Sequence, residues 1–275
     1  MNSKQILYLL TIALLLTSCS SMYIPAVRSI PLLEKKGEFQ AEGGVSTNSV
    51  YANVSAAITN DIAVSVNGNM SWRNFSDRYD LFTDIYEEPP SGSMFFDAPD
   101  DRGKFAHRYG EVSMGKINIS SLNKVKLEVF SGAGMGRATD IDYFSKSDNY
   151  KTDYYSIFGN VNVGIRHQIV EAGGSMRLAF SLFNYAAHYG DERTSYQDKF
   201  GAFHIEPMGF CRIGGKNLKA VFRFGINLAF PININEESEG RRGFDPWNGK
   251  WENTNFHLSI GVSYRIGGNK NHKFH

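Results

Sequence analysis

Long runs of alternating apolar and polar residues limit most strongly what this chain can fold into. In Ile62–Trp72, IAVSVNGNMSW, most apolar side chains fall on one face and small polar side chains on the other. Lys219–Phe230 repeats the pattern, and its second face carries Arg223 and Asn227. A period of two residues is typical of a β-strand. A dry core would leave Arg223 and Asn227 without partners at a high cost, so we expect this face to meet water or a polar lumen.

The same pattern predicts ten strands. They lie near residues 38–47, 50–59, 62–72, 107–118, 125–136, 154–167, 175–187, 201–213, 219–230 and 256–266. Strands of globular proteins typically have about five or six residues, whereas roughly 9–11 residues cross a bilayer at a tilt. The length of these strands therefore favours membrane-spanning strands.

The connections between the predicted strands alternate between short and long. Turns rich in Gly, Asn and Ser are predicted at 60–61, 120–124, 168–174 and 214–218, as tight hairpins require. Long polar segments lie between them at 73–106, 137–153, 188–200 and 231–255, the short tip at 48–49 being the exception. This alternation is typical of an up-and-down outer-membrane barrel with short periplasmic turns and long outer loops.

The N-terminus has the features of a bacterial lipoprotein signal. Lys4 precedes the apolar run Ile6–Leu16, which is too short to span a bilayer. The following Leu-Thr-Ser-Cys resembles a lipobox, so residues 1–18 are predicted to be removed and Cys19 to be acylated. The alternative is an ordinary secretory signal. The resemblance to lipoproteins, with Ser20 and Ser21 after the cysteine, implies sorting to the outer membrane.

The rest of the chain divides into three parts. Residues 19–36, which include Pro25 and Pro31, are predicted to form an extended, lipidated tether from the periplasmic leaflet to the first strand. Packing of their apolar side chains on the barrel rim is the alternative. Residues 37–266 are predicted to form the barrel, and 267–275 a periplasmic tail.

Several stretches resemble the outer-membrane β-barrel lipoproteins of Bacteroidota. They are YIPAVRSIPLLEKKGEFQAEGGVS, AAITNDIAVSVNGNMSW, LEVFSGAGMGR, VNVGIRHQ, MRLAFSLFNY and FHIEPMGFCRIGGKNLKAVFRFGINLAF, which together cover most of the mature chain. The resemblance implies an outer-membrane location, a lipidated N-terminus and a barrel. It implies no catalytic or ligand-binding residues.

Composition narrows the range of functions. The 29 basic and 28 acidic residues nearly cancel, which gives no electrostatic basis for nucleic-acid binding. Cys19 and Cys211 are the two cysteines, and an acylated Cys19 leaves no disulfide to expect. Cys211 is predicted to face lipid. We find no spacing typical of a nucleotide, cofactor or metal site.

The polar faces of the strands predict a charged lumen. The inward residues are Glu38, Gln40, Glu42, Glu111, Lys126, Glu128, Arg166, Arg177, His204, Glu206, Arg212, Arg223, His257 and Arg265. Five of them are expected to form a basic belt near the short turns: Lys126, Arg166, Arg177, Arg212 and Arg265. The belt either selects anions in a narrow pore or pairs with Glu38, Glu42, Glu128 and Glu206 as an ionic plug. The small bore of ten strands favours the plug.

Two other functional hypotheses remain open. His204 and Glu206 face the same way, and with an inward serine such as Ser181 they suggest a lipid-modifying enzyme, although no nucleophile motif accompanies them. The third hypothesis is a soluble lipocalin-like binder, which requires an apolar lumen. The polar faces argue against it, and structural hydrogen bonding is the preferred role of His204.

The outer end is where binding partners are expected. Aromatic residues at the loop ends of strands predict an interfacial girdle of Trp72, Tyr155, Phe230 and Phe256, with Tyr264 at the inner interface. The acidic, aromatic loop 73–106 and the loop 231–255 are candidates for contact with a surface glycan, a protein or lipopolysaccharide. The sequence thus predicts a lipid-anchored outer-membrane barrel with a structural, surface-interaction or small-solute passage role and no catalysis.

Overall fold

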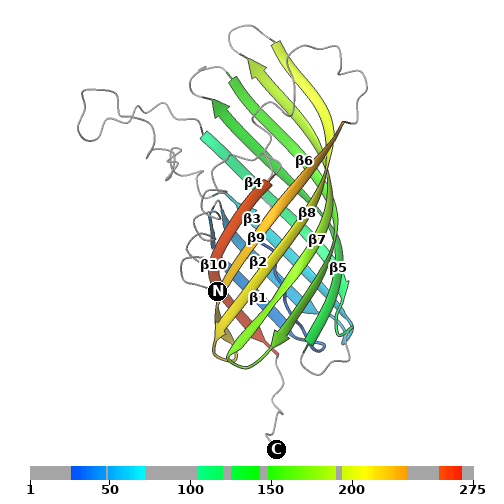
Figure 1. Cartoon of the computed structure of the whole chain (residues 1–275), viewed down its shortest axis with the longest axis vertical. Helices are drawn as coiled ribbons and strands as arrows, with labels where there is room; N and C mark the ends of the chain where they lie inside the picture. The colour runs from blue at the N-terminus through cyan, green and yellow to red at the C-terminus, as the bar shows by residue number, and fades with distance from the viewer. Residues whose placement is uncertain are drawn as a thin grey trace, which may run out of the picture.

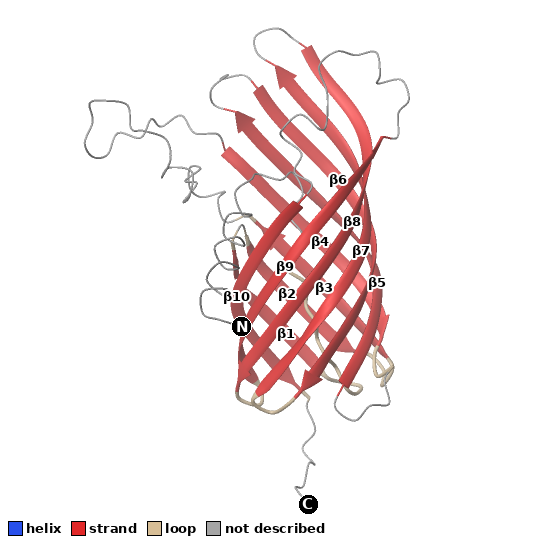
Figure 2. Cartoon of the chain, viewed as in Figure 1, coloured by secondary structure: helices blue, strands red, loops and turns tan. Residues whose placement is uncertain are grey.

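The computed structural model is a closed barrel of antiparallel strands (Figures 1 and 2). It describes residues 26–47, 49–71, 104–119, 125–142, 148–189, 194–233 and 254–267. The strands are β1 (Phe39–Ser46), β2 (Val50–Ala57), β3 (Ile62–Met70), β4 (Lys104–Lys116), β5 (Val125–Asp142), β6 (Asp148–Arg166), β7 (Val170–Tyr189), β8 (Thr194–Gly214), β9 (Leu218–Asn233) and β10 (Thr254–Ile266).

Each strand pairs with its neighbours in sequence, and β1 pairs with β10 to close the barrel. This confirms the predicted all-β fold with ten antiparallel strands. β9 shows why the alternation was informative, because Phe222 and Phe224 are exposed on the outside while Arg223 is buried inside. Within the described residues no helix is long and apolar enough to cross a membrane.

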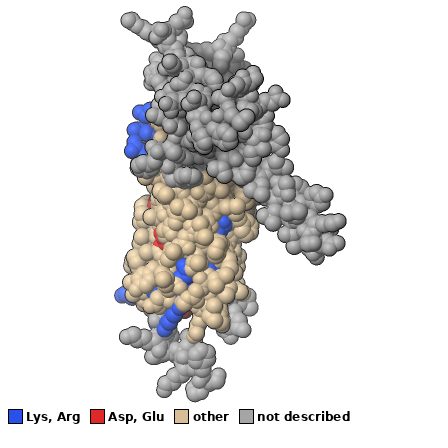
Figure 3. Space-filling view, turned by 90° about the vertical axis from the view of Figure 1, so that its left-hand side faces the viewer, with Lys and Arg blue, Asp and Glu red and all other residues tan. Residues whose placement is uncertain are grey.

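Large apolar side chains cover the outer face of the barrel. All ten strands contribute at least one exposed Val, Ile, Leu, Met, Phe or Tyr. Figure 3 shows few charged atoms on the middle of the wall, and Lys and Arg atoms near its lower rim. Tyr155, Phe230 and Tyr264 of the predicted girdle are exposed. Phe256 is half-buried, and Trp72 lies outside the described residues.

The strands differ greatly in length. β1, β2 and β3 have 8, 8 and 9 residues, whereas β5, β6, β7 and β8 have 18, 19, 20 and 21. The long strands form a wall that projects past the short ones at the end opposite the short turns (Figure 1). We call this part the projecting wall.

The projecting wall corrects two predicted loops. Most of 137–153 and 188–200 is strand, because β5 continues to Asp142 and β7 to Tyr189. The polar composition of these segments suggested loops, yet Arg137 of β5 hydrogen bonds across to Asp153 of β6, with Nη2 and Oδ2 3.1 Å apart. This hydrogen bond lowers the pKa of the Asp153 carboxyl. The ends of the other two predicted loops are also strand, and residues 72–103 and 234–253 lie outside the described residues.

One predicted short turn was also wrong. The turn placed at 168–174 is shorter, because β7 begins at Val170 and Glu171 already faces the lumen. Gly173 and Gly174 suggested a turn, but they lie inside the strand. A Cβ at Gly173 would collide with the Val163 carbonyl oxygen, so the glycine permits close approach of the two backbones. The predicted turn at 120–124 lies outside the described residues.

Glycines also form the closing seam between β1 and β10. Gly44 and Gly261 are partners in the register, and the Tyr51 side chain lies across both. A Cβ at either position would collide with the Tyr51 hydroxyl. The same hydroxyl accepts a hydrogen bond of 2.9 Å from Arg223, so the seam is joined to the charged lumen.

We therefore expect Gly261→Leu to destabilise the barrel by about 1–3 kcal/mol, the usual effect of overpacking. The added side chain would displace Tyr51 from Arg223. Urea unfolding in detergent, followed by heat-modifiable gel migration, measures the change. Ile260→Leu on the outer face is the matched control and should have little effect; equal stability of the two variants would contradict the prediction.

Candidate functional site: a lumen filled by the N-terminal segment

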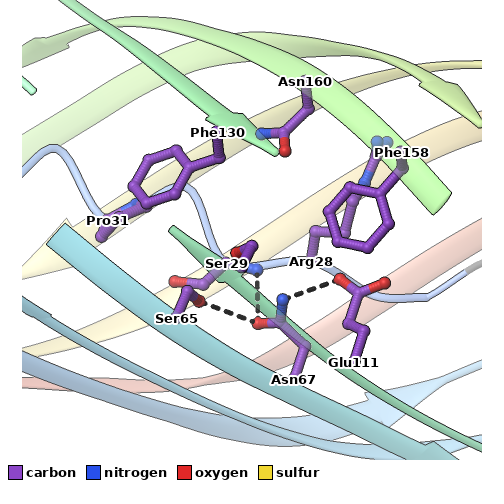
Figure 4. A pocket seen from close by; sticks show the side chains of 10 residues that line it. Arg28, Ser29, Pro31, Ser65, Asn67, Glu111, Phe130, Phe158 and Asn160 are labelled. Carbon is purple, nitrogen blue, oxygen red and sulfur yellow. Dashed lines mark hydrogen bonds between the residues drawn. The ribbon is translucent and has the colours of Figure 1, made fainter. Parts of the chain in front are cut away.

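Residues 26–33, which we call the lumenal segment, lie inside the barrel. Ile30 and Leu32 are 0% exposed and Leu33 1%, and the remaining residues of the segment are buried as well. Figure 4 shows the segment, with Arg28, Ser29 and Pro31, passing between side chains of the barrel wall. The sequence predicted a tether outside the barrel or packing on its rim, so the position in the lumen is a correction for this part of 19–36.

Three arginines bind three consecutive carbonyl groups of the lumenal segment. Arg212 donates to the Ile30 oxygen at 2.5 Å, Arg265 to the Pro31 oxygen at 2.7 Å, and Arg166 to the Leu32 oxygen at 3.3 Å. A buried backbone carbonyl needs a donor, and this segment has no neighbouring strand to supply one. Three members of the predicted basic belt therefore act as donors to the chain's own backbone.

Polar side chains of other strands bind further backbone groups of the segment. The Leu33 N–H donates to Glu128 at 2.8 Å, and the Ser29 N–H donates to Asn67 at 3.4 Å. Asn53 donates to the Val27 carbonyl at 2.8 Å. With the arginines, the side chains that contact this backbone come from β2, β3, β5, β6, β8 and β10. The segment is thus held from several sides of the barrel.

The apolar side chains of the segment fill two small cores in an otherwise polar lumen. Ile30 and Leu32 pack with Met208 and Phe210 of β8. Leu32 also reaches Gly164, where a Cβ would lie 2.9 Å from its Cδ1. Leu32 has a φ of 49°, a strained value for leucine that costs of order 1–3 kcal/mol. Burial of a leucine or isoleucine contributes roughly 1.5–3 kcal/mol each, which offsets the strain.

The second core lies closer to the short turns. Leu33 packs with Ala57 of β2, Ala63 of β3, Ile117 just after β4, and Phe130 of β5. All five residues are at most 3% exposed. The small side chains of Ala57 and Ala63 leave the space that Leu33 occupies, so the short-turn mouth is closed by an apolar contact as well as by charges.

Glu171 is the centre of an ion network at this mouth. Its carboxylate lies 2.6 Å from Arg265, 3.1 Å from Arg212 and 3.8 Å from Arg166. Arg166 also pairs with Glu38 at 3.0 Å. The carboxylates neutralise the arginines that bind the lumenal segment, as a buried charge requires.

A second set of ion pairs lies deeper in the lumen. Arg177 contacts Glu111 at 2.7 Å and Glu206 at 3.6 Å, and Arg28 of the lumenal segment contacts Glu206 at 3.5 Å. The predicted belt is therefore divided. Arg177 is not near the short turns, because its strand begins at Val170 and not at the predicted residue 175.

The remaining member of the belt and the inward Glu42 are also paired, whereas Glu128, predicted to pair with an arginine, instead accepts hydrogen bonds from the Leu33 N–H and from Asn162. Lys126 lies at the mouth, 3.5 Å from Glu34, and both side chains are partly exposed. Glu42 binds Arg212 at 2.7 Å and also pairs with Arg223. These ion pairs fit the predicted ionic plug and do not fit a belt of arginines open to a pore.

A small cavity lies beside the lumenal segment. A cavity of about 10 Å³, enough for about one water molecule, lies among Arg28, Ser29, Asn67 and Glu111 (Figure 4). The Asn67 amide donates to Glu111 at 2.8 Å across this cavity. This cavity is too small to hold a solute larger than water.

His204, Glu206 and Ser181 all face the lumen and are at most 1% exposed. Ser181 hydrogen bonds to Ser156 at 2.7 Å, and the Nδ1 atom of His204 lies 3.2 Å from Asn227. These partners are on neighbouring strands, so the contacts join strands to one another. In the described ranges no group of three or more His, Cys, Asp or Glu residues is arranged to hold a metal ion.

Cys211 is half-buried on the outer face, beside the inward Phe210 and Arg212 of the same strand. Cys19 lies outside the described residues.

Sequence reasoning missed two parts of this site. Glu171 was assigned to a turn. The lumenal segment was assigned to a tether because it has no periodicity of its own and because Pro31 lies within it and Pro25 just before it. The excess of inward arginines near the short turns was the available signal. They needed acceptors, and the wall carboxylates predicted for them were too few.

We expect Glu171→Gln to destabilise the barrel by about 3–5 kcal/mol, because it leaves Arg265 without its carboxylate partner and removes one of the two carboxylates that pair with Arg212. Urea unfolding of the refolded protein in detergent measures this change. Asp153→Asn, which removes a partly exposed carboxylate that pairs with Arg137 in the projecting wall, is the matched control and should change stability little. A Glu171→Gln barrel as stable as the control would contradict the role given to Glu171.

The arrangement can close a barrel and fix its N-terminal segment by hydrogen bonds and ion pairs. No protein-family model and no curated protein matches this chain.

Proposed function

We propose that this protein is an outer-membrane barrel, lipid-anchored at Cys19, whose lumen is closed by its own N-terminal segment. Its role is structural and interactive at the cell surface, without solute passage and without catalysis. One observation carries the proposal: the barrel exposes apolar side chains on its outside and buries paired charges and its own chain inside.

The apolar outer face supports insertion in a membrane. Soluble monomers rarely expose contiguous apolar patches larger than a few hundred Å², whereas transmembrane barrels carry an apolar band about 25 Å tall. A lipocalin-like binder would need the opposite distribution. The arginines and glutamates of the lumen count against that alternative.

The filled lumen argues against a passage for small solutes. It also argues against an enzyme that uses His204, because this side chain is completely buried. The parts left for function are the projecting wall and the loops joined to the long strands. We propose that 73–106 and 231–255 contact a surface glycan, a protein or lipopolysaccharide, as their aromatic and acidic composition indicates.

The resemblance of the chain to outer-membrane lipoproteins of Bacteroidota supports the same location. It gives the orientation in which the short turns face the periplasm and the long loops face outward. The lipobox-like sequence before Cys19 supplies the second membrane attachment.

The location and the anchor have a direct test. We expect the protein in the outer-membrane fraction, with heat-modifiable gel migration and with palmitate labelling that Cys19→Ala abolishes. Heat-modifiable migration should persist in Cys19→Ala, because the fold does not depend on the lipid. A mature chain that is monodisperse without detergent would contradict membrane insertion.

The closed lumen is tested by conductance. The wild-type barrel in a planar bilayer should show no stable opening, because ion pairs and the lumenal segment fill it. Deletion of residues 20–33 should produce a pore that prefers anions, since Arg166, Arg212 and Arg265 lose their carbonyl acceptors. Stable openings of the wild-type protein would contradict closure, and heat-modifiable migration shows whether the deleted variant is folded.

A further inference from the structure

We propose that the acylated N-terminus leaves the barrel at the end of the projecting wall and the long loops, so that the lipid on Cys19 lies at the cell surface. This inference rests on the proposed function, which supplies the acylation and the orientation. It differs from the expectation of a periplasmic tether. The direction in which the lumenal segment runs carries it.

The chain reverses direction just before β1. β1 begins with Phe39 at the short-turn end of the barrel, where Gly37 has a φ of 81° and the Glu38 N–H donates to the Lys35 carbonyl at 3.1 Å. Followed backwards from this turn, the chain does not leave into the periplasmic side. It enters the lumen.

The contacts of the segment then move away from the short turns. Leu33 and Leu32 touch side chains at the short-turn ends of strands, Glu128 near the start of β5 and Arg166 at the end of β6. Pro31 and Ile30 are bound by Arg265 and Arg212, close to the ends of β10 and β8.

Further back, the partners lie in the middle of the strands. The Ser29 N–H donates to Asn67 inside β3, and the Val27 carbonyl accepts from Asn53 inside β2. Arg28 contacts Glu206, well inside the long strand β8. Ala26 is therefore deep in the barrel, with the chain heading toward the long loops.

A return to the short-turn mouth would need a second path through the lumen. That mouth is filled by Ile30, Leu32 and Leu33, which are at most 1% exposed, and by the ion network around Glu171. The cavity of about 10 Å³ beside Arg28 and Ser29 has no room for a second chain. The path that remains for the residues before Ala26 leads toward the long loops.

The residues between Cys19 and Ala26 are enough to complete this path. There are six of them, and the seven Cα–Cα steps from Cys19 to Ala26 span at most roughly 23–25 Å when extended. The apolar band of a transmembrane barrel is about 25 Å tall, so the distance from its middle to the outer interface is roughly half of that. Cys19 can therefore reach the outer leaflet with length to spare.

The route is tested with single cysteines in a Cys211→Ala background, where Cys19 is blocked by its acyl group. Met22→Cys reports on the N-terminus, Ser238→Cys on a predicted long loop and Lys216→Cys on the short turn between β8 and β9. A membrane-impermeant biotin–maleimide is applied to intact and to lysed cells. Palmitate labelling and heat-modifiable migration are measured for every variant.

The inference predicts that Met22→Cys and Ser238→Cys react in intact cells, while Lys216→Cys reacts only after lysis. If Ser238→Cys reacts in intact cells but Met22→Cys reacts only after lysis or not at all, the surface route is overturned and the proposed function stands. Reaction of Lys216→Cys but not Ser238→Cys in intact cells overturns the proposed orientation. Absence of palmitate overturns the anchor and the inference with it.

An epitope inserted between Ser21 and Met22 gives a second readout that needs no free thiol. An antibody should bind this epitope on intact cells, as it should bind the same epitope inserted at Ser238. Binding at Ser238 alone would again overturn the surface route.

Discussion

The need of buried arginines for acceptors governs the interior of this barrel. Ten strands enclose a narrow lumen, and each of the inward arginines Arg166, Arg212 and Arg265 near the short turns donates both to a wall carboxylate and to a backbone carbonyl. Glu171 supplies charge, while the carbonyls of Ile30, Pro31 and Leu32 supply acceptors. The arginines and the lumenal segment therefore stabilise each other: the backbone carbonyls accept hydrogen bonds from the arginines, and a backbone without a strand partner needs such donors.

Much of the fold could be predicted, because the alternation of side chains along a strand shows from neighbouring residues alone which ones share a face. Phe222 and Arg223 are neighbours in sequence, and their alternation alone separates outside from inside. The strand boundaries were harder to predict, because the sequence of the projecting wall is rich in polar residues and loses the alternation of apolar and polar side chains. There Arg137 and Asp153 look like loop residues until their cross-strand contact is known.

The candidate site was only half predictable for a different reason. The inward charges follow from alternation, but the lumenal segment has no period of its own. Its hydrogen-bond partners come from six strands spread over most of the chain, so no window of sequence contains the pattern. The inward position of Glu171 was missed because Gly173 and Gly174 suggested a turn, whereas these glycines allow close packing of the backbone in β7.

The glycine seam between β1 and β10 places a limit on how the molecule is assembled. Because the lumenal segment is buried among the side chains of six strands, it cannot be threaded through the barrel after closure. The N-terminal segment must already lie along the inner face of the curling sheet when Gly44 meets Gly261 and Tyr51 settles over them. The seam between β1 and β10 therefore closes around a segment that is already in place.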